Sequence, residues 1–253
     1  MKKNSRVRRF DLGSDKPFTV SRSRIQGFLD CPRCFYLQNR LGIKALRSLP
    51  FRLNSATDTL LKKTFDTARE KQVPHRYFKE KKIDLVPFQH EKIDEWRENF
   101  QGVKYHYKKA NLIVQGAVDD ILINLKTKEL SPIEFKSTQT KDGESVKYLG
   151  KPHHKFWKNQ LEIYGYLLEK NGFKISENSY IVFCNAQIDK NDEWNEKLDF
   201  DVQVIPYKIE YSWVEPTLDK IKSLLNQDTI PNFSDPDHCD VCRFLLQHKE
   251  NKI

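Results

Sequence analysis

A carboxylate and a lysine stand two residues apart in the stretch LSPIEFKST, residues 130–138. Side chains alternate along a β-strand, so Glu134 and Lys136 share one face while Ile133 and Phe135 point to the other. Two interpretations fit this spacing. One is a structural ion pair, and the other is a hydrolytic site in which the carboxylate binds a cation and the ammonium group assists.

A second acidic position precedes this stretch by one hairpin. Asp119 and Asp120 interrupt the apolar run VQGAVDDILIN. An unpaired carboxylate in a sheet is costly, and neighbouring carboxylates raise each other's pKa. A divalent cation removes that cost, and Mg²⁺ prefers a few hard oxygen ligands. We therefore expect Asp119, Glu134 and the carbonyl of Phe135 to bind Mg²⁺ or Mn²⁺, with Lys136 beside the attacking water or the scissile phosphate.

The stretch NQLEIYGYLL follows, with Gln160 and Tyr164 four residues apart. On a helix this spacing places both side chains on one face, while Leu161, Leu167 and Leu168 serve the core. By itself the pair fits the polar edge of an amphipathic helix equally well.

Hydrophobic periodicity predicts the elements that position these residues. A helix over 54–71, capped by Asn54 or Ser55, has Leu60, Leu61, Thr64, Phe65 and Ala68 facing inward. Further helices are expected on both sides of Pro32 and over 90–100, 153–172 and 214–227, with a short one at the cysteine-bearing tail. Three strands are expected within 103–138, and others over 177–186 and 198–209. The pattern predicts one α/β domain.

Three motifs occur in a fixed order: Gly116-x-x-Asp119, Glu134-x-Lys136 and Gln160-x-x-x-Tyr164. In this order, over about residues 21–247, they resemble the PD-(D/E)XK nuclease superfamily. The resemblance is greatest to its RecB-like branch, with the CRISPR-associated RecB-like exonucleases and the nuclease domain of AddB. It implies a restriction-endonuclease-like core, a mixed β-sheet flanked by helices. It also implies that the aspartate and glutamate bind Mg²⁺ or Mn²⁺, that the lysine assists hydrolysis, and that the Gln/Tyr pair contacts DNA and braces the site.

One motif departs from that family. Its members often carry a histidine ligand on the first long helix, where this chain has NSATDTLL and offers Asp58 instead. Asp58 is a candidate metal ligand, because carboxylates suit Mg²⁺. It equally fits a solvated acid in the first turn of a helix, favoured by the helix dipole.

The cysteines form two pairs at opposite ends of the chain, Cys31-Pro-Arg-Cys34 and Cys239-Asp-Val-Cys242. Each C-x-x-C turn aims two thiolates at one ion, and two turns complete a four-cysteine shell that joins the terminal segments. The alternative is four buried, reduced cysteines. The fifth, Cys184, lies in an apolar strand and is expected in the core.

The RecB-like resemblance bears on the metal at these cysteines. Many such relatives tie their termini with a 4Fe–4S cluster held by one N-terminal and three C-terminal cysteines. Cys31, Cys239 and Cys242 match three of these, the fourth position is His248, and Cys34 is left to compensate. We favour an iron–sulfur cluster by kinship, with Zn²⁺ as the alternative that the two-plus-two arrangement suits.

The 253-residue chain is basic, with a net charge of +9 and a pI near 9.1. This favours a polyanionic partner. The stretch KYLGKPHHKFWKNQ joins Lys147, Lys151, Lys155 and Lys158 with His153, His154 and Trp157, a combination that suits single-stranded or frayed DNA or a solvated loop. Residues 1–20 are expected as a flexible basic arm before a single domain over 21–253. With no apolar run or signal core, we expect no membrane contact and a cytoplasmic location.

These observations favour a metal-dependent DNA nuclease that acts on single strands or duplex ends in repair, recombination or defence. No helicase motif is present, so unwinding would come from a partner such as a helicase or another repair or defence protein. Two other functions remain: a non-catalytic nucleic-acid-binding module that keeps the nuclease fold, and a metal-stapled scaffold for a protein partner.

Overall fold

The computed structural model describes residues 9–43, 52–140, 150–151, 155–188, 194, 196–235 and 237–250. The chain divides into two compact units. We call one the cysteine unit, Met1–Leu49, His106–Gln115 and Ser212–Ile253, and the other the sheet unit, Pro50–Tyr105 and Gly116–Tyr211. Each unit is described by itself.

The sheet unit is built on a five-stranded mixed sheet with strand order β2-β5-β6-β7-β8. The central β6–β7 pair is parallel, and the other neighbours are antiparallel. The strands are β2 (Val86–Pro87), β5 (Asp120–Ile123), β6 (Leu130–Thr138), β7 (Asn178–Gln187) and β8 (Asp199–Lys208). Its helices are α3 (Arg52–Lys71), α4 (Arg76–Glu80), α5 (Ile93–Arg97) and α7 (Lys155–Lys170).

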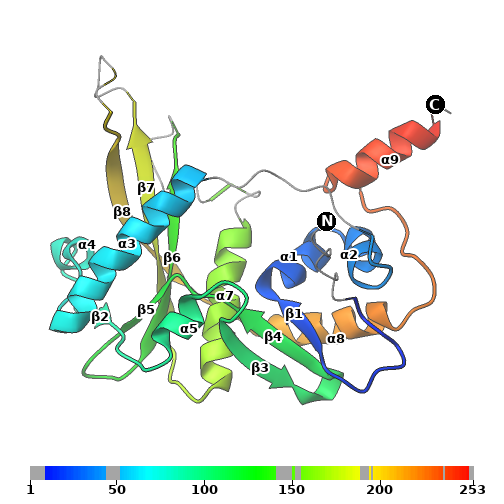
Figure 1. Ribbon diagram of the computed structural model, residues 1–253, viewed down its shortest axis with the longest axis horizontal. Helices are drawn as coiled ribbons and strands as arrows, with labels where there is room; N and C mark the ends of the chain where they lie inside the picture. The colour runs from blue at the N-terminus through cyan, green and yellow to red at the C-terminus, as the bar shows by residue number, and fades with distance from the viewer. Residues whose placement is uncertain are drawn as a thin grey trace, which may run out of the picture. The chain divides into compact units, whose positions relative to one another are not determined.

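Helices α3 and α7 cover opposite faces of this sheet (Figure 1). Phe65 of α3 packs with Phe135 and Val182, while Leu161 of α7 packs with Ile181 and Phe183. The adjacent residues Val182 and Phe183 thus belong to different cores, as the alternation of a strand buried on both faces requires. Glu134, one residue before Phe135, therefore faces α7.

Two details of these elements differ from the prediction. Helix α3 begins at Arg52, before the expected caps, and Leu60 is 63% exposed although it was placed inward. Thr64, also placed inward, is exposed. Leu61, Phe65 and Ala68 are buried as predicted, because they share the stripe that faces the sheet. Helix α7 is followed by Gly172 at φ +91°, as expected of a glycine just past a helix end.

The sequence predicted three strands between residues 103 and 138, but the structure has four there. They are β3 (Val103–Tyr107), β4 (Leu112–Gly116), β5 and β6. Strands β4 and β3 belong to a three-stranded sheet of order β1-β4-β3, in which β1 (Phe18–Ser21) is parallel to β4. The apolar run around Gly116 therefore leaves one sheet and enters the other at Asp119.

The cysteine unit combines β1, most of β4 and the end of β3 with four helices and a 3₁₀ turn. Helices α1 and α2 both pack against α8. Its helical elements are α1 (Arg22–Asp30), α2 (Pro32–Asn39), η1 (Lys108–Ala110), α8 (Val214–Leu225) and α9 (Asp240–Glu250). Helices α1 and α2 meet at Cys31, as predicted. Residues 18–20, which we placed in the basic arm, lie in β1.

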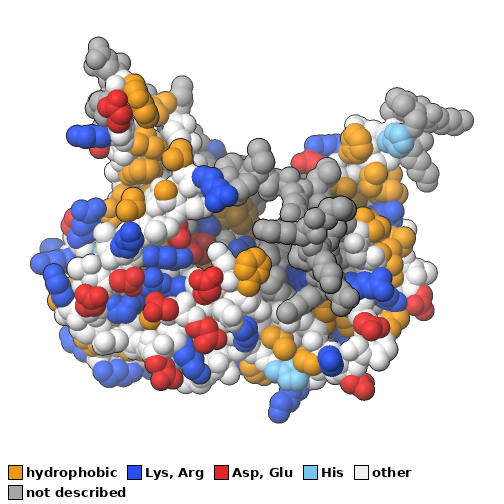
Figure 2. Space-filling model, in the orientation of Figure 1, with side chains coloured by type: hydrophobic (Ala, Val, Ile, Leu, Met, Phe, Trp, Pro, Cys, Tyr) orange, Lys and Arg blue, Asp and Glu red, His pale blue; other side chains and the backbone are white. Residues whose placement is uncertain are grey.

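Charge is divided unevenly between the two units. The cysteine unit contains 19 Lys and Arg against 10 Asp and Glu, whereas the sheet unit contains 25 of each. Figure 2 shows basic and acidic side chains interspersed over the part that contains α3 and α5. The whole net charge of +9 therefore belongs to the cysteine unit. Within the described residues, every helix is too short or too polar to cross a membrane.

Candidate active site and cysteine cluster

Lys136 lies at the centre of a polar group on the α7 face of β6. Its Nζ donates to Oε1 of Glu134, and also to Oε1 of Gln160 at 3.2 Å. The same Nζ lies 5.5 Å from the ring centroid of Trp157. The ion pair expected from the E-x-K spacing is therefore present, and it contains both residues expected to act in hydrolysis.

Gln160 and Tyr164 extend this group along α7. The Nε2 of Gln160 donates to the hydroxyl of Tyr164 at 3.3 Å, and both residues are buried. A Cβ on Gly116 would lie 3.0 Å from Cε1 of Tyr164. The glycine of the G-x-x-D motif thus makes room for the tyrosine ring, so the motifs predicted from sequence are in direct contact.

Asp119 joins the group from the chain before β5. Its Oδ2 accepts the backbone N–H of Phe135 at 2.7 Å. Asp120 pairs with Ile133 in the antiparallel β5–β6 ladder. If the same register continues by one residue, Asp119 lies opposite Glu134. Burial, together with the negative charge of Glu134, raises the pKa of Asp119 to about 7, although Lys136 acts to lower it. A cation between the two carboxylates would stabilise both charged forms.

Glu134 has a carboxylate oxygen available for such a cation. The side chain is 2% exposed, and its Oε2 has no hydrogen-bond partner among the described residues. A buried carboxylate oxygen without a partner is costly. Coordination by a hard divalent cation would satisfy it, so Glu134 and Asp119 fit Mg²⁺ or Mn²⁺ by chemistry.

Asp58 lines a cavity of about 240 Å³ beside these residues. Its Oδ2 pairs with Nζ of Lys62 at 3.0 Å, and burial and the charge of Asp119 raise its pKa. Other side chains that line the cavity are Asn54, Thr57, Leu61, Phe135, Lys136, Ser137 and Trp157. Asp58 therefore shares this cavity with Lys136, whereas Asp119 and Glu134 are not among the residues that line it.

The carboxylates do not form a complete metal shell in this structure. Of the described residues, only the four cysteines form a group of three or more His, Cys, Asp or Glu ligand atoms that could hold one metal ion. Asp58, Asp119 and Glu134 do not form such a group. The metal-ligand roles of Asp58 and of the Phe135 carbonyl stay predictions.

Asp120 has a structural environment that the sequence did not reveal. It is fully buried, and Nη2 of Arg69 donates to both of its oxygens at 2.7 and 2.8 Å. Arg97 lies 3.7 Å from it and also binds Asp66. These four residues tie α3 and α5 to β5. Arg69 and Asp120 are 51 residues apart, so no local spacing indicates the pair.

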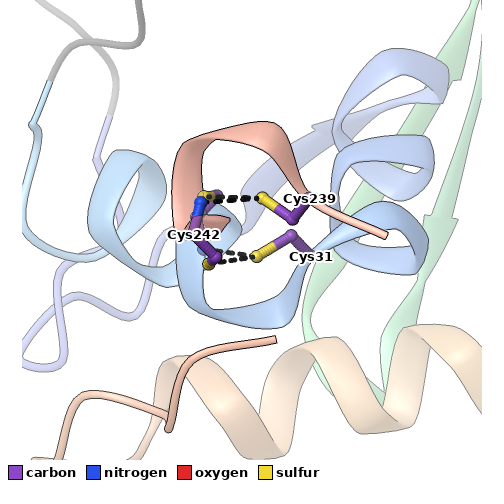
Figure 3. A group of neighbouring side chains, drawn as sticks. Cys31, Cys239 and Cys242 are labelled. Atoms are coloured by element: carbon purple, nitrogen blue, oxygen red, sulfur yellow. Dashed lines mark hydrogen bonds between the residues drawn. The ribbon is translucent and has the colours of Figure 1, made fainter. Parts of the chain in front are cut away.

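The four cysteines of the two C-x-x-C pairs meet within the cysteine unit. Cys31 Sγ lies 3.6 Å from Cys242 Sγ, and Cys34 Sγ lies 3.7 Å from Cys239 Sγ. Figure 3 shows Cys31 facing the chain segment that carries Cys239 and Cys242. Although burial opposes it, hydrogen bonds from Ser234 and the Cys34 N–H lower the pKa of Cys31 to about 7. Burial and the neighbouring thiols raise the pKa of Cys34 and Cys242, a cost that a bound cation would remove. The cluster therefore fits a thiolate metal site.

A comparison with protein families agrees with the motif order. The model of the PD-(D/E)XK nuclease superfamily matches residues 19–245. The chain belongs to this superfamily. Members of the PD-(D/E)XK superfamily are usually metal-dependent nucleases that use divalent cations. A comparison with curated proteins gives no match.

Other residues singled out from the sequence have different environments in this PD-(D/E)XK protein. Cys184 is buried in the core, as expected. His248 is exposed and lies outside the cysteine cluster. Lys147, His153 and His154 lie outside the described residues. Trp157, expected as a stacking surface, is 8% exposed and packs in the α7 core, and it also lines the cavity beside Lys136. Its position on the helix that carries Gln160 is the sequence signal for this role.

Proposed function

We propose that the protein is a Mg²⁺- or Mn²⁺-dependent DNA nuclease of the RecB-like branch. One observation supports this most strongly: the buried oxygen of Glu134 without a partner lies in the same group as Asp119, Lys136 and the Gln160–Tyr164 pair. A structural ion pair alone would not require Asp119 beside it. Nor would it require a cavity lined by Lys136, Asp58 and Trp157.

In this proposal, Asp119 and Glu134 bind the divalent cation, with Asp58 as a further ligand from α3. The cation would supply charge neutralisation and an activated water for phosphodiester hydrolysis. Lys136 holds a proton at Nζ, and its positive charge stabilises the charge that develops on the phosphate. Gln160 accepts from Lys136 and donates to Tyr164, so this chain of hydrogen bonds orients the ammonium group.

The proposed substrate is single-stranded or frayed DNA. Trp157, although largely buried, lines the cavity beside Lys136, and an aromatic ring next to a positive charge suits a base and its phosphate there. The excess positive charge of the cysteine unit favours a polyanion. Action in repair, recombination or defence with a helicase or a similar partner, and a cytoplasmic location, belong to the same proposal.

The test is cleavage of single-stranded DNA, blunt duplex, frayed duplex and RNA of one sequence, each with Mg²⁺ or Mn²⁺. We expect cleavage of single-stranded and frayed DNA. Lys136→Met and Glu134→Gln should each lower the rate by roughly 10²-fold or more, because the first removes the positive charge beside the phosphate and the second weakens binding of the cation. Lys174→Met is the control, since Lys174 is 68% exposed and pairs with Glu129 away from this group.

Two further measurements separate a loss of hydrolysis from a loss of folding or of DNA binding. Thermal unfolding of each variant shows whether it is folded, and DNA binding shows whether only hydrolysis is lost. If the wild-type protein binds DNA but does not cleave it with either Mg²⁺ or Mn²⁺, the proposal is contradicted and the non-catalytic binding module is favoured. Rates unchanged by both substitutions would remove Lys136 and Glu134 from the mechanism.

A further inference from the structure

We infer that the four cysteines bind one tetrahedrally coordinated metal ion, Zn²⁺, instead of the 4Fe–4S cluster that the RecB-like resemblance implies. This inference concerns Cys31, Cys34, Cys239 and Cys242 in the cysteine unit, and it is independent of the proposed nuclease activity.

The distances between the sulfur atoms carry the inference. A tetrahedral Zn²⁺ site has Zn–S bonds of about 2.3 Å, which places neighbouring sulfurs about 3.8 Å apart. The Cys31–Cys242 and Cys34–Cys239 sulfur pairs are 3.6 and 3.7 Å apart, and all four sulfurs lie within 4.8 Å of one another. In a 4Fe–4S cluster each thiolate binds a different iron, and sulfide ions lie between the irons. Four thiolates around that cluster stand much farther apart than these do.

The backbone around the cysteines repeats the same local geometry twice. Cys31 Sγ accepts the backbone N–H of Cys34 at 3.3 Å, and Cys239 Sγ accepts that of Cys242 at 3.5 Å. In each pair the first cysteine directly precedes a helix and the second lies in its first turn. Helix N-termini and N–H donors stabilise thiolates. Each pair is thus organised to present two sulfurs to one ion.

The donor set also distinguishes the two metals. The one-plus-three pattern of the iron–sulfur relatives needs a ligand at His248, but His248 is exposed and outside the cluster. Cys34 is the fourth donor instead. Four thiolates in a closed shell are the usual ligands of structural Zn²⁺. Cys31 additionally contacts the hydroxyl of Ser234 at 3.0 Å, an outer contact that helps to fix its orientation.

The experiment is elemental analysis of the full-length protein, purified without oxygen from cells supplied with both iron and zinc. We expect about one zinc per chain, no acid-labile sulfide and a colourless solution. Roughly four iron and four sulfide per chain, with broad visible absorption, would overturn the inference. So would a metal-free protein that fails to take up Zn²⁺, or Co²⁺ as a coloured tetrahedral probe.

Two matched variants separate the ligand sets. Cys34→Ser should lower zinc content and weaken Co²⁺ binding, whereas His248→Ala should leave both at the wild-type level. The opposite pattern, with metal retained in Cys34→Ser and lost in His248→Ala, would show the one-plus-three arrangement and contradict the inference. Because metal content is the readout, neither outcome depends on nuclease activity.

Discussion

Asp119 and Asp120 are adjacent, yet their carboxylates have opposite environments. Asp119 accepts the N–H of Phe135 beside Glu134, whereas Asp120 is paired with Arg69 in the protein interior. Successive side chains point to opposite sides of an extended chain. One acidic position therefore serves the candidate site, and the next anchors the fold around it.

At the same scale, Gly116→Ala tests the contact between the G-x-x-D motif and α7. The added Cβ would lie 3.0 Å from Tyr164 and 3.2 Å from Leu167, so neighbouring side chains must move. We expect a loss of about 1–3 kcal/mol in the free energy of unfolding, measured by urea denaturation. Displacement of Tyr164 should also lower DNA cleavage.

Gly27→Ala provides the control for this substitution. Gly27 lies inside α1, and a Cβ there would meet nothing within 4 Å. Because alanine favours helix over glycine, stability should stay the same or rise by up to about 1 kcal/mol. Equal losses in both variants would show that crowding at Tyr164 is not the cause.

The pH dependence of stability contains a contribution from His75. Its ring stacks on Phe65 at 4.0 Å and is buried, and burial together with the charge of Arg76 lowers its pKa to about 4. The unfolded chain binds a proton near pH 6.5, where the folded chain does not. This contribution is therefore complete above pH 6.5 and is lost as the pH falls toward 4.

We expect His75→Asn to flatten part of this acid dependence. Between about pH 7 and pH 4.5, the wild type should lose roughly 1–3 kcal/mol more stability than the variant. Asparagine retains a side-chain acceptor at the start of α4, where His75 accepts the Tyr77 N–H. Parallel stability curves, measured by urea denaturation at each pH, would exclude this role.

The residues of the candidate site could be predicted where one local rule suffices. The alternation of β6 placed Glu134 and Lys136 together, and helical spacing placed Gln160 with Tyr164. The Arg69–Asp120 pair could not be predicted, because it depends on how two elements meet. The prediction that Leu60 is buried was wrong, because Leu60 is one residue from Leu61 on the helix and lies beside the buried stripe, not in it.

At the scale of elements, the change of sheet after Gly116 was also hidden from the sequence. Strand β4 pairs with β1, and β5 pairs with β2 and β6, although one continuous apolar run contains both. A run of apolar residues predicts burial but not the partner strand. The connection between these strands places Asp119 directly before β5.

The buried charges that hold α3 against β5 make a prediction for these elements. Arg69→Met leaves Asp120 buried without its bidentate partner, and should cost about 3–5 kcal/mol. Adding Asp120→Asn should recover part of that loss, since the unpaired charge is removed. Both values come from urea denaturation.

The exposed pair of Lys174 and Glu129 is the reference for this prediction. Their side chains are 68% and 29% exposed, so Lys174→Met should cost less than about 1 kcal/mol. If Arg69→Met lowers the free energy of unfolding by no more than Lys174→Met does, the role of the buried Arg69–Asp120 pair is contradicted. A double variant less stable than Arg69→Met would show that Asp120 contributes through its remaining contacts.

At the scale of the whole molecule, the cysteine cluster joins segments that are far apart in the chain. Cys34 and Cys239 are 205 residues apart. A metal that binds only the folded state adds its binding energy to stability and closes a long loop. The sheet unit has cores of its own, formed by α3 and α7 against the strands. Metal loss should therefore affect the two units differently.

Cys239→Ser tests this difference by hydrogen exchange. Amide exchange should become faster in α1, α2 and α9, which carry or adjoin the cluster. Strands β6 and β7 should keep their protection, because none of the four clustered cysteines lies in their core. Cys184→Ala is the matched control: Cys184 lies in the sheet-unit core, so its loss should leave metal content and α9 exchange unchanged. A uniform rise in exchange across both units would mean that they unfold together, and the cysteine cluster would then stabilise the entire chain.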